Sequence, residues 1–481
     1  MINNAPLPLG PTSTYSAKSE QARRIWIMLG LFWASPFIFY AAHIGRLSNY
    51  LFPLLALVVG AVLIFKKPNL YLSHVWWLWM LTPEIRRLID YQIGWQPVDP
   101  VMLSPYLATA LATLTVVSNI RLLNKKYLFP FALSAVGVLY GYVVGIITSG
   151  ILPATFALLN WLLPILFALH IAIRWRDYEP NKNAIMNTFI AATAVMGAYG
   201  LLQFIAPPPW DRFWMISSKM MSIGQPYPFE VRVFGTMNSP GPFAFEIMGT
   251  LLLLFVAKGF WRIPAAVVGY LALLLSLVRA AWGGWAIGLL YILYRSKPKH
   301  FVRYMLGVIV LVSLALPIAT YEPISKHINA RFNSIENIQQ NASYQSRVDL
   351  YKRFAIMSLS SPFGTGLGSL GVAARLSTNG QVVDFDSGIM EVPYSLGWLG
   401  GGLFYIGAIW NLLYITLNKR TKSDVFIAAA VGIALATFSA MIFTNTLIGT
   451  TGMLFWGFCG AAVSGIKYMK IFHKNQDGRF S

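Results

Sequence analysis

The stretch IPAAVVGYLALLLSLVRAAWGGWAIGLLYILY, residues 263–294, is the part of the sequence that best constrains the fold. As one helix its 32 residues would extend about 48 Å, well beyond a bilayer's hydrocarbon core of about 30 Å. Lys258 and Arg262 precede it and Arg295 follows it, so both of its ends belong on the basic, cytoplasmic side. We therefore predict two short helices that meet on the outer side near Arg279, in a recessed or polar turn.

Apolar stretches of this kind recur along the whole chain. Of its 481 residues, 56% are hydrophobic and only 11% are charged, which is typical of a polytopic helical membrane protein. We predict an all-α protein with about 14 transmembrane helices. The predicted spans are 25–42, 50–65, 71–82, 103–119, 128–148, 151–173, 184–206, 241–257, 263–278, 280–294, 301–320, 393–417, 425–443 and 448–466.

The distribution of charge predicts the orientation of these helices. With the N-terminus in the cytoplasm, 24 of the 37 lysines and arginines fall on the cytoplasmic side and 13 on the outer side. Of the 17 acidic residues, 5 fall inside and 12 outside. This alternation indicates that both termini are cytoplasmic. The net charge of +20 is then explained by anionic lipid headgroups, without a nucleic-acid partner.

The spans divide the chain into five regions. Residues 1–24 form a cytoplasmic tail with no cleavage site, so the first helix is retained. The others are helices 1–11 over 25–320, with outer loops 83–103 and 207–240, a large extracytoplasmic loop over 321–392, helices 12–14 over 393–466, and a cytoplasmic tail over 467–481. Apolar spacing in the large loop predicts an amphipathic helix over 343–360. The short span 71–82, followed by charged residues, suggests a re-entrant or interfacial element.

Three arginines, Arg232, Arg279 and Arg347, lie on or beside the predicted outer face, where positive charge is normally depleted. Arginine is always charged and binds phosphate oxygens in bidentate fashion, so the three together suggest a lipid-linked pyrophosphate. Each has a plainer alternative. Arg279 suits a snorkelling helix end, Arg232 an ordinary loop cation, and Arg347 a structural ion pair with Asp349 or Glu336.

The sequence gives little indication of a disulfide, a metal site or a nucleotide-binding loop. The single cysteine, Cys459, excludes a disulfide within the chain and a multi-cysteine metal site. The outer segments show no His/Asp/Glu spacing of a metal site, so neither metal nor cofactor is expected. Residues 362–371, PFGTGLGSLG, lack the Lys-Ser/Thr pair of a nucleotide-binding loop. Glu246, inside a predicted helix, is the one carboxylate that suggests a proton or cation pathway.

Four stretches carry a family resemblance. They are RVFGTMNSPGPFA at 232–244, SLVRAAW at 276–282, Arg347 followed by PFGTGLG at 362–368, and Asp386-Ser387 with Gly397 and Gly400. Their order and spacing resemble the O-antigen ligase/polymerase superfamily of bacterial membrane glycosyltransferases, which includes the Wzy-type polymerases. The resemblance covers roughly residues 185–470. It implies a GT-C-like, metal-independent enzyme whose donor is a glycan on undecaprenyl pyrophosphate and whose acceptor is a sugar hydroxyl.

The resemblance also assigns expected roles to residues. Arg232, Arg279 and Arg347 would bind the pyrophosphate, and Arg279 and Asp386 would be catalytic, with Asp386 as the base. The sugar-binding candidates are Glu230, Asn238, Asp384, Glu391 and Tyr394. Plainer interpretations stay open here too: a solvated acidic turn for Asp386, an interfacial carboxylate for Glu391 and the aromatic belt of a helix for Tyr394.

The fourth motif separates the candidate functions. Ligases of this family usually have histidine and asparagine where this chain has Asp386 and Ser387. We therefore predict a polymerase of exopolysaccharide or O-antigen repeats in the bacterial inner (plasma) membrane, with an extracytoplasmic active site. Its expected partners are the lipid-linked donor and acceptor, the bilayer, and a chain-length regulator and flippase of the same pathway. The alternatives are a ligase that transfers glycan to lipid A core and a flippase or transporter of lipid-linked sugars.

Overall fold

The computed structural model of the protein describes residues 12–296, 302, 361–376 and 387–477. Within these ranges the regular structure is helical, apart from one isolated antiparallel bridge between Gly224 and Val231. The α-helices are α1 (Thr12–Ala41), α2 (Gly45–Lys66), α3 (Pro68–Ile93), α4 (Ser104–Ala110), α5 (Ala112–Ser118), α6 (Phe129–Ser149), α7 (Ile151–Ile173), α8 (Tyr178–Ile205), α9 (Pro209–Ser218), α10 (Pro240–Val256), α11 (Arg262–Leu275), α12 (Arg279–Arg295), α16 (Gly371–Ala374), α17 (Gly388–Leu417), α18 (Val425–Ser439) and α19 (Gly449–Asp477). The 3-10 helices are η1 (Pro100–Leu103), η2 (Ile120–Asn124), η3 (Trp175–Asp177), η4 (Met221–Ile223), η6 (Lys419–Lys422) and η7 (Ala440–Ile442).

Eight of the described helical stretches are long and apolar enough to cross a membrane. They are Glu20–Ala41, Gly45–Lys66, Pro100–Ser118, Phe129–Ser149, Ile151–Ile173, Trp175–Ile205, Gly388–Leu417 and Val425–Ile442. Pro240–Val256 and Arg262–Leu275 are shorter apolar helices. The prediction of an all-helical, multi-pass membrane protein is therefore confirmed. The count of about 14 spans stays a prediction, since most of the predicted span 301–320 and most of the large loop lie outside the described residues.

The helix expected over 71–82 is longer than predicted. Helix α3 continues through Pro83 to Ile93, so residues 83–93 are not part of an outer loop and do not form a separate re-entrant element. Arg86, Arg87 and Asp90 lie on this helix and are buried. Because these charges have partners inside the protein, the helix can carry them without exposing them to lipid.

The predicted break in 263–294 is confirmed. Helix α11 ends at Leu275 and α12 begins at Arg279, so neither helix spans the whole stretch. Leu277, between them, has a φ of 56°, a left-handed conformation that a residue with a branched side chain adopts at a cost. The Ser276 hydroxyl donates to the carbonyl of Leu273 at 2.6 Å and closes the last turn of α11.

Small residues let the helices of the bundle pack closely. Helix α17 packs along α6 and α12 along α18. A Cβ added at Gly407 of α17 would lie 2.4 Å from the carbonyl oxygen of Pro130, and one at Gly288 of α12 would lie 2.9 Å from that of Gly432. Such close approach of backbones is the usual way in which helices associate inside a membrane, where lipid tails are as apolar as the side chains.

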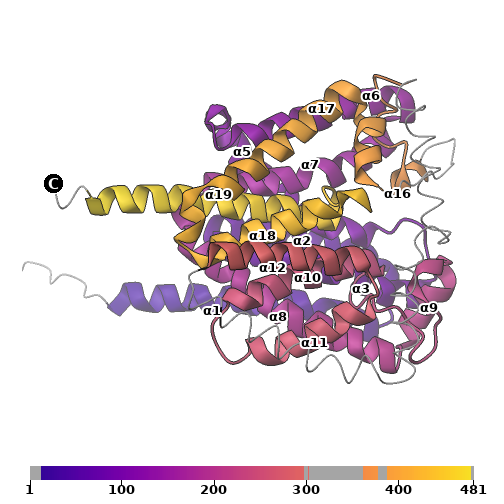
Figure 1. Cartoon of the computed structure of the whole chain (residues 1–481). Coiled ribbons are helices and arrows are strands. Elements are labelled where there is room, and N and C mark those ends of the chain that lie inside the picture. Colours follow the sequence, from indigo (N-terminus) through magenta and orange to yellow (C-terminus); the bar gives the residue numbers. More distant parts are fainter. Residues whose placement is uncertain (1–11, 297–301, 303–360, 377–386, 478–481) are drawn as a thin grey trace, which may run out of the picture.

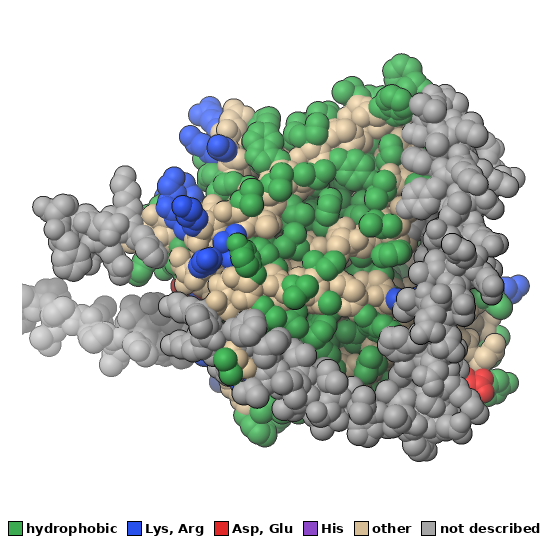
Figure 2. Space-filling model, viewed as in Figure 1, with side chains coloured by type: hydrophobic (Ala, Val, Ile, Leu, Met, Phe, Trp, Pro, Cys, Tyr) green, Lys and Arg blue, Asp and Glu red, His purple; other side chains and the backbone are tan. Residues whose placement is uncertain are grey.

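The two ends of the bundle differ in charge. Figure 1 shows α9 and α16 at one end of the molecule and the C-terminal end of α19 projecting from the other. In Figure 2 hydrophobic side chains cover the middle of the visible face, and most of its Lys and Arg side chains gather at the end near α19. This is the asymmetry expected of a membrane protein with one basic face.

Candidate active site

The short segment that carries Arg232 is attached to the end of α11. The N–H of Arg232 donates to the carbonyl of Ile223 at 3.0 Å, next to the bridge between Gly224 and Val231. The following N–H, of Val233, donates to the carbonyl of Leu275 at 3.1 Å. The backbone therefore brings the first sequence motif to the break between α11 and α12.

The side chain of Arg232 contacts the same break. Its Nε donates to the carbonyl of Ser276 and its Nη2 to that of Leu277, both at 3.3 Å. Its Nη1 donates to the carbonyl of Ser222 at 2.8 Å. Leu277 lies two residues before Arg279, so the turn held by Arg232 is the one that places Arg279. Two predicted pyrophosphate ligands from separate motifs thus meet at one turn.

Arg279 occupies an unusual position for a cation. It is the first residue of α12 and is half-buried. The N-terminus of a helix carries positive partial charge, so a cation there is opposed by the helix dipole unless an anion is also present. Guanidinium, dipole and backbone N–H groups act in the same direction on an anion at such a site.

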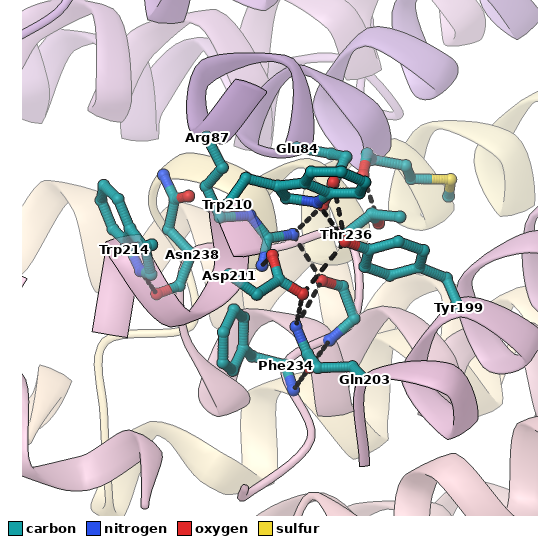
Figure 3. A network of polar contacts seen from close by, with 12 residues as sticks. Glu84, Arg87, Tyr199, Gln203, Trp210, Asp211, Trp214, Phe234, Thr236 and Asn238 are labelled. Carbon is teal, nitrogen blue, oxygen red and sulfur yellow. Dashed lines mark hydrogen bonds and ion pairs between the residues drawn. The ribbon is translucent and has the colours of Figure 1, made fainter. Parts of the chain in front are cut away.

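A buried ion cluster contacts Phe234 and Gly235, directly after the Arg232 segment (Figure 3). Arg87 of α3 and Asp211 of α9 are fully buried, and Arg87 Nη1 lies 2.8 Å from Asp211 Oδ1. Arg87 Nη2 pairs with Glu84, one helical turn away, and also donates to the carbonyl of Gly235 at 2.5 Å. The Arg87 guanidinium lies over the Phe234 ring, 4.8 Å from its centroid. Arg87 thus joins two carboxylates to the backbone of the first motif.

Gln203 of α8 holds the same backbone from a second direction. Its Oε1 accepts the N–H groups of Phe234 and Gly235 at 3.0 and 2.9 Å, and its Nε2 donates to Asp211 Oδ2 at 2.7 Å. Gly235 has a φ of 51°, and a Cβ there would lie 2.3 Å from the Phe243 ring. The motif therefore needs glycine at this position.

Tyr199 completes the cluster. Its hydroxyl lies 2.8 Å from Glu84 Oε1 and 3.0 Å from Asp211 Oδ2, and it accepts a hydrogen bond from Trp210 Nε1 at 2.8 Å. Burial raises the pKa of the Asp211 carboxyl, and the Arg87 guanidinium opposes that shift. Two carboxyl groups therefore face a single guanidinium, and the hydroxyl lies between them.

A second cluster fixes the segment after α3. Arg86 Nε lies 3.0 Å from Asp99 Oδ2 and 3.3 Å from Asp90 Oδ2. Asn49 Nδ2 of α2 donates to Asp99 Oδ1 at 3.1 Å. The Arg86 guanidinium also lies over the ring of Trp214 on α9, 4.9 Å from its centroid. Helices α2, α3 and α9 are thereby linked beside the site.

The glycine-rich segment is a packing element. The N–H of Thr365 donates to the carbonyl of Tyr394 at 2.8 Å, and that of Gly366 to Ser395 at 3.0 Å. The next N–H, of Leu367, donates to a carbonyl of α6 at 2.9 Å. Because these N–H groups are bonded to protein carbonyls, they do not form a phosphate cradle. The third and fourth motifs are instead joined by backbone hydrogen bonds.

The start of α17 is linked to α12 through η7. The Ser387 hydroxyl donates to the carbonyl of Met441 at 3.3 Å, and η7 packs against both α17 and α12. Glu391, in the first turn of α17, and Tyr394 are half-buried. The fourth motif therefore approaches the helix that begins with Arg279.

The remaining predicted site residues fall into two groups. Arg347, Asp384 and Asp386 lie outside the described residues. Glu230 is exposed, and Asn238 is half-buried, with its carbonyl accepting a hydrogen bond from the Trp214 indole at 3.3 Å. The roles assigned to all the predicted site residues stay predictions.

The sequence analysis did not single out Arg87, Asp211 or Gln203. The charges of 83–103 pointed to this region, and the spacing of Glu84 and Arg87 places both on one helix face. No local pattern indicated that Asp211, far along the chain, is the partner of Arg87.

Within the described ranges, no group of three or more His, Cys, Asp or Glu side chains could hold a metal ion. Metal independence stays a prediction. Cys459 is buried in α19. Glu246 is buried in α10, and its two carboxylate oxygens have no hydrogen-bond partner in the part of the chain described.

One comparison with known proteins gives a match. Residues 264–405 match the family model Wzy_C, described as O-antigen ligase. The match begins near the start of α11 and ends within α17, so it contains the turn before Arg279, the glycine-rich segment and the Gly397 kink. No curated protein matches the chain.

Proposed function

We propose that the chain polymerises glycan repeats as a member of the O-antigen ligase/polymerase superfamily, whose members are glycosyl-transferring membrane enzymes. The match of residues 264–405 to the family model described as O-antigen ligase supports this assignment. Its substrates would be oligosaccharides on undecaprenyl pyrophosphate, joined on the outer face of the bacterial inner membrane by a GT-C-like enzyme of about 14 spans. The observation that carries this proposal is the meeting of Arg232 and Arg279 at the start of α12.

The arrangement suits the departure of a pyrophosphate. In transfer with inversion, the acceptor hydroxyl attacks the anomeric carbon while the bond from that carbon to the pyrophosphate oxygen breaks. Negative charge grows on the leaving oxygen, where a guanidinium and a helix N-terminus stabilise it. Asp386 would take the proton of the attacking hydroxyl. Its neighbour Ser387 is anchored on η7, which packs against α12.

Transfer to lipid A core is the second candidate function. It is favoured by the description of the matching family, O-antigen ligase. Against it stands the pair Asp386-Ser387 in place of histidine and asparagine. The two functions use the same donor and differ in the acceptor, so an acceptor comparison separates them.

The proposed orientation puts both termini in the cytoplasm and the site outside. It is supported by the gathering of Lys and Arg side chains near the C-terminal end of α19 in Figure 2 and by the position of α9 and α16 at the opposite end in Figure 1. A basic face is normally the cytoplasmic one.

The deciding experiment uses purified full-length protein and undecaprenyl-pyrophosphate-linked single repeats, with products resolved by gel and mass spectrometry. We expect a ladder from the wild type and a loss of at least about 100-fold in turnover for Arg279→Ala, the scale seen when one charge-stabilising donor is removed. Arg375→Ala is the matched control, because Arg375 is an exposed arginine directly after α16. No ladder from single repeats, but transfer to added lipid A core, would establish the ligase. Full activity of Arg279→Ala would refute the role of Arg279.

A further inference from the structure

We propose that Arg87, held between Glu84 and Asp211, is a positioning residue of the transfer site. It would fix the backbone of residues 233–236 and, through it, the guanidinium of Arg232 and the turn before Arg279. The inference rests on the proposed function and deepens it, because it identifies what sets the geometry of the two arginines.

The contacts form a continuous path. Arg87 donates to the carbonyl of Gly235, whose own N–H is bonded to Gln203. Two residues earlier, the N–H of Val233 is bonded to the last residue of α11. Arg232 then reaches the carbonyls of Ser276 and Leu277. The path consists of these hydrogen bonds joined by the backbone of residues 232–235, and Figure 3 shows its Arg87 end.

Arg87 is well suited to impose one geometry. A guanidinium presents its N–H groups in a planar, rigid fork. The ion pair of Nη1 with Asp211 and the hydrogen bonds of Nη2 to Glu84 and Gly235 therefore set its orientation. The side chain has 0% exposure, so water does not compete for these donors. Lysine, with a single flexible ammonium, could not replace all three contacts in the same plane.

A contribution to folding stability does not by itself explain why these three charges are buried together. Burying charges costs desolvation, and replacing a whole buried ion pair by uncharged side chains of similar volume is often neutral or stabilising. Removing a single partner, by contrast, leaves an uncompensated buried charge and destabilises the fold. The structural and positioning roles can therefore be separated by removing all three charges together.

The test variant is the charge-free triple Glu84→Gln, Arg87→Met and Asp211→Asn in the full-length protein. The Asn side chain keeps an oxygen for Gln203, and no charge is left unpaired. Lys182→Gln is the control, because Lys182 forms an ion pair with Asp424, at 3.0 Å, that joins α8 and α18 without contacting the Arg232 segment. Gly235→Ala perturbs the same backbone independently, since its Cβ would overlap the Phe243 ring.

Three quantities are measured: the Kd for undecaprenyl pyrophosphate, and the kcat and KM for the lipid-linked donor. We expect the triple variant to unfold at the wild-type temperature, yet to lose roughly tenfold to hundredfold in kcat/KM, the scale of a small misplacement of reacting groups. Gly235→Ala should give a similar loss, and the two combined should lose less than the product of the single effects, because both act through one backbone.

Three results would overturn the inference: wild-type affinity and turnover in the folded triple variant, a fully multiplicative loss when it is combined with Gly235→Ala, or an equal loss in Lys182→Gln. Failure of the proposed function looks different. If the wild type binds undecaprenyl pyrophosphate but builds no ladder, the polymerase function is refuted. The Kd of the triple variant compared with that of the wild type then decides the role of Arg87. A wild type that neither binds it nor transfers glycan would overturn both.

Discussion

Gly397→Ala tests whether the kink of α17 holds the glycine-rich segment. At φ 66° and ψ −177°, Gly397 occupies a backbone region that is nearly exclusive to glycine, and any other residue there costs about 1–3 kcal/mol. A Cβ would also lie 2.5 Å from the carbonyl carbon and oxygen of Phe363. Overpacking of a tight contact costs a further 1–3 kcal/mol or so, about 2–6 kcal/mol together. If the segment instead moves away, α17 loses the bond from the Trp398 N–H to the carbonyl of Pro362.

The assay is thermal unfolding of purified protein in detergent. The fraction of protein that stays soluble and monodisperse is measured at each temperature. Gly402→Ala is the matched control, because it lies on the same helix with no atom within 4 Å of the added Cβ. We expect Gly397→Ala to lower the midpoint by roughly 2–6 °C, at about 1 °C per kcal/mol for a chain of this length, and to reduce glycan transfer. Gly402→Ala should be neutral or slightly stabilising, because alanine favours helix. Equal midpoints for the two variants would refute the reasoning.

The remaining predictions concern residues outside the site. His43 follows α1 in the left-handed conformation, with a φ of 56°, and the Ile44 N–H donates to the carbonyl of Phe39. Because glycine adopts this conformation at less cost than alanine, the free energy of unfolding of His43→Gly should exceed that of His43→Ala by about 1 kcal/mol. Equal denaturation midpoints would contradict this. Cys459 is 0% exposed, so a membrane-permeant maleimide should label the folded protein far more slowly than the denatured protein. Labelling at equal rates would show that α19 is not packed as described.

The sequence predicted best where a length or a charge alternation leaves few choices. The stretch 263–294 is too long for one span. Because both of its ends are basic, they belong on the same side of the membrane, which requires an even number of spans. The structure does separate α11 from α12 there. The same approach was wrong for α3. Hydropathy ends the span at Thr82, because it counts Glu84, Arg87 and Asp90 as costly in lipid wherever they lie. A hydropathy value is the same for a charged residue whether or not that residue has an ion-pair partner inside the bundle.

The sequence by itself determined the class of the protein, because apolar runs and basic loops require membrane-spanning helices. The order of its motifs pointed to a resemblance to the O-antigen ligase/polymerase superfamily, which the family-model match at 264–405 supports. The sequence also singled out Arg232 and Arg279, together with Arg347, as candidate pyrophosphate ligands. Only the tertiary structure decided what holds Arg232 and Arg279. Arg87 meets Asp211 because α3 packs against α9, and the glycine-rich segment packs on the α17 kink because α6 lies beside it. Hydropathy and charge alternation are properties of neighbours along the chain. A buried hydrogen bond depends on which distant helices meet, and no local pattern encodes that.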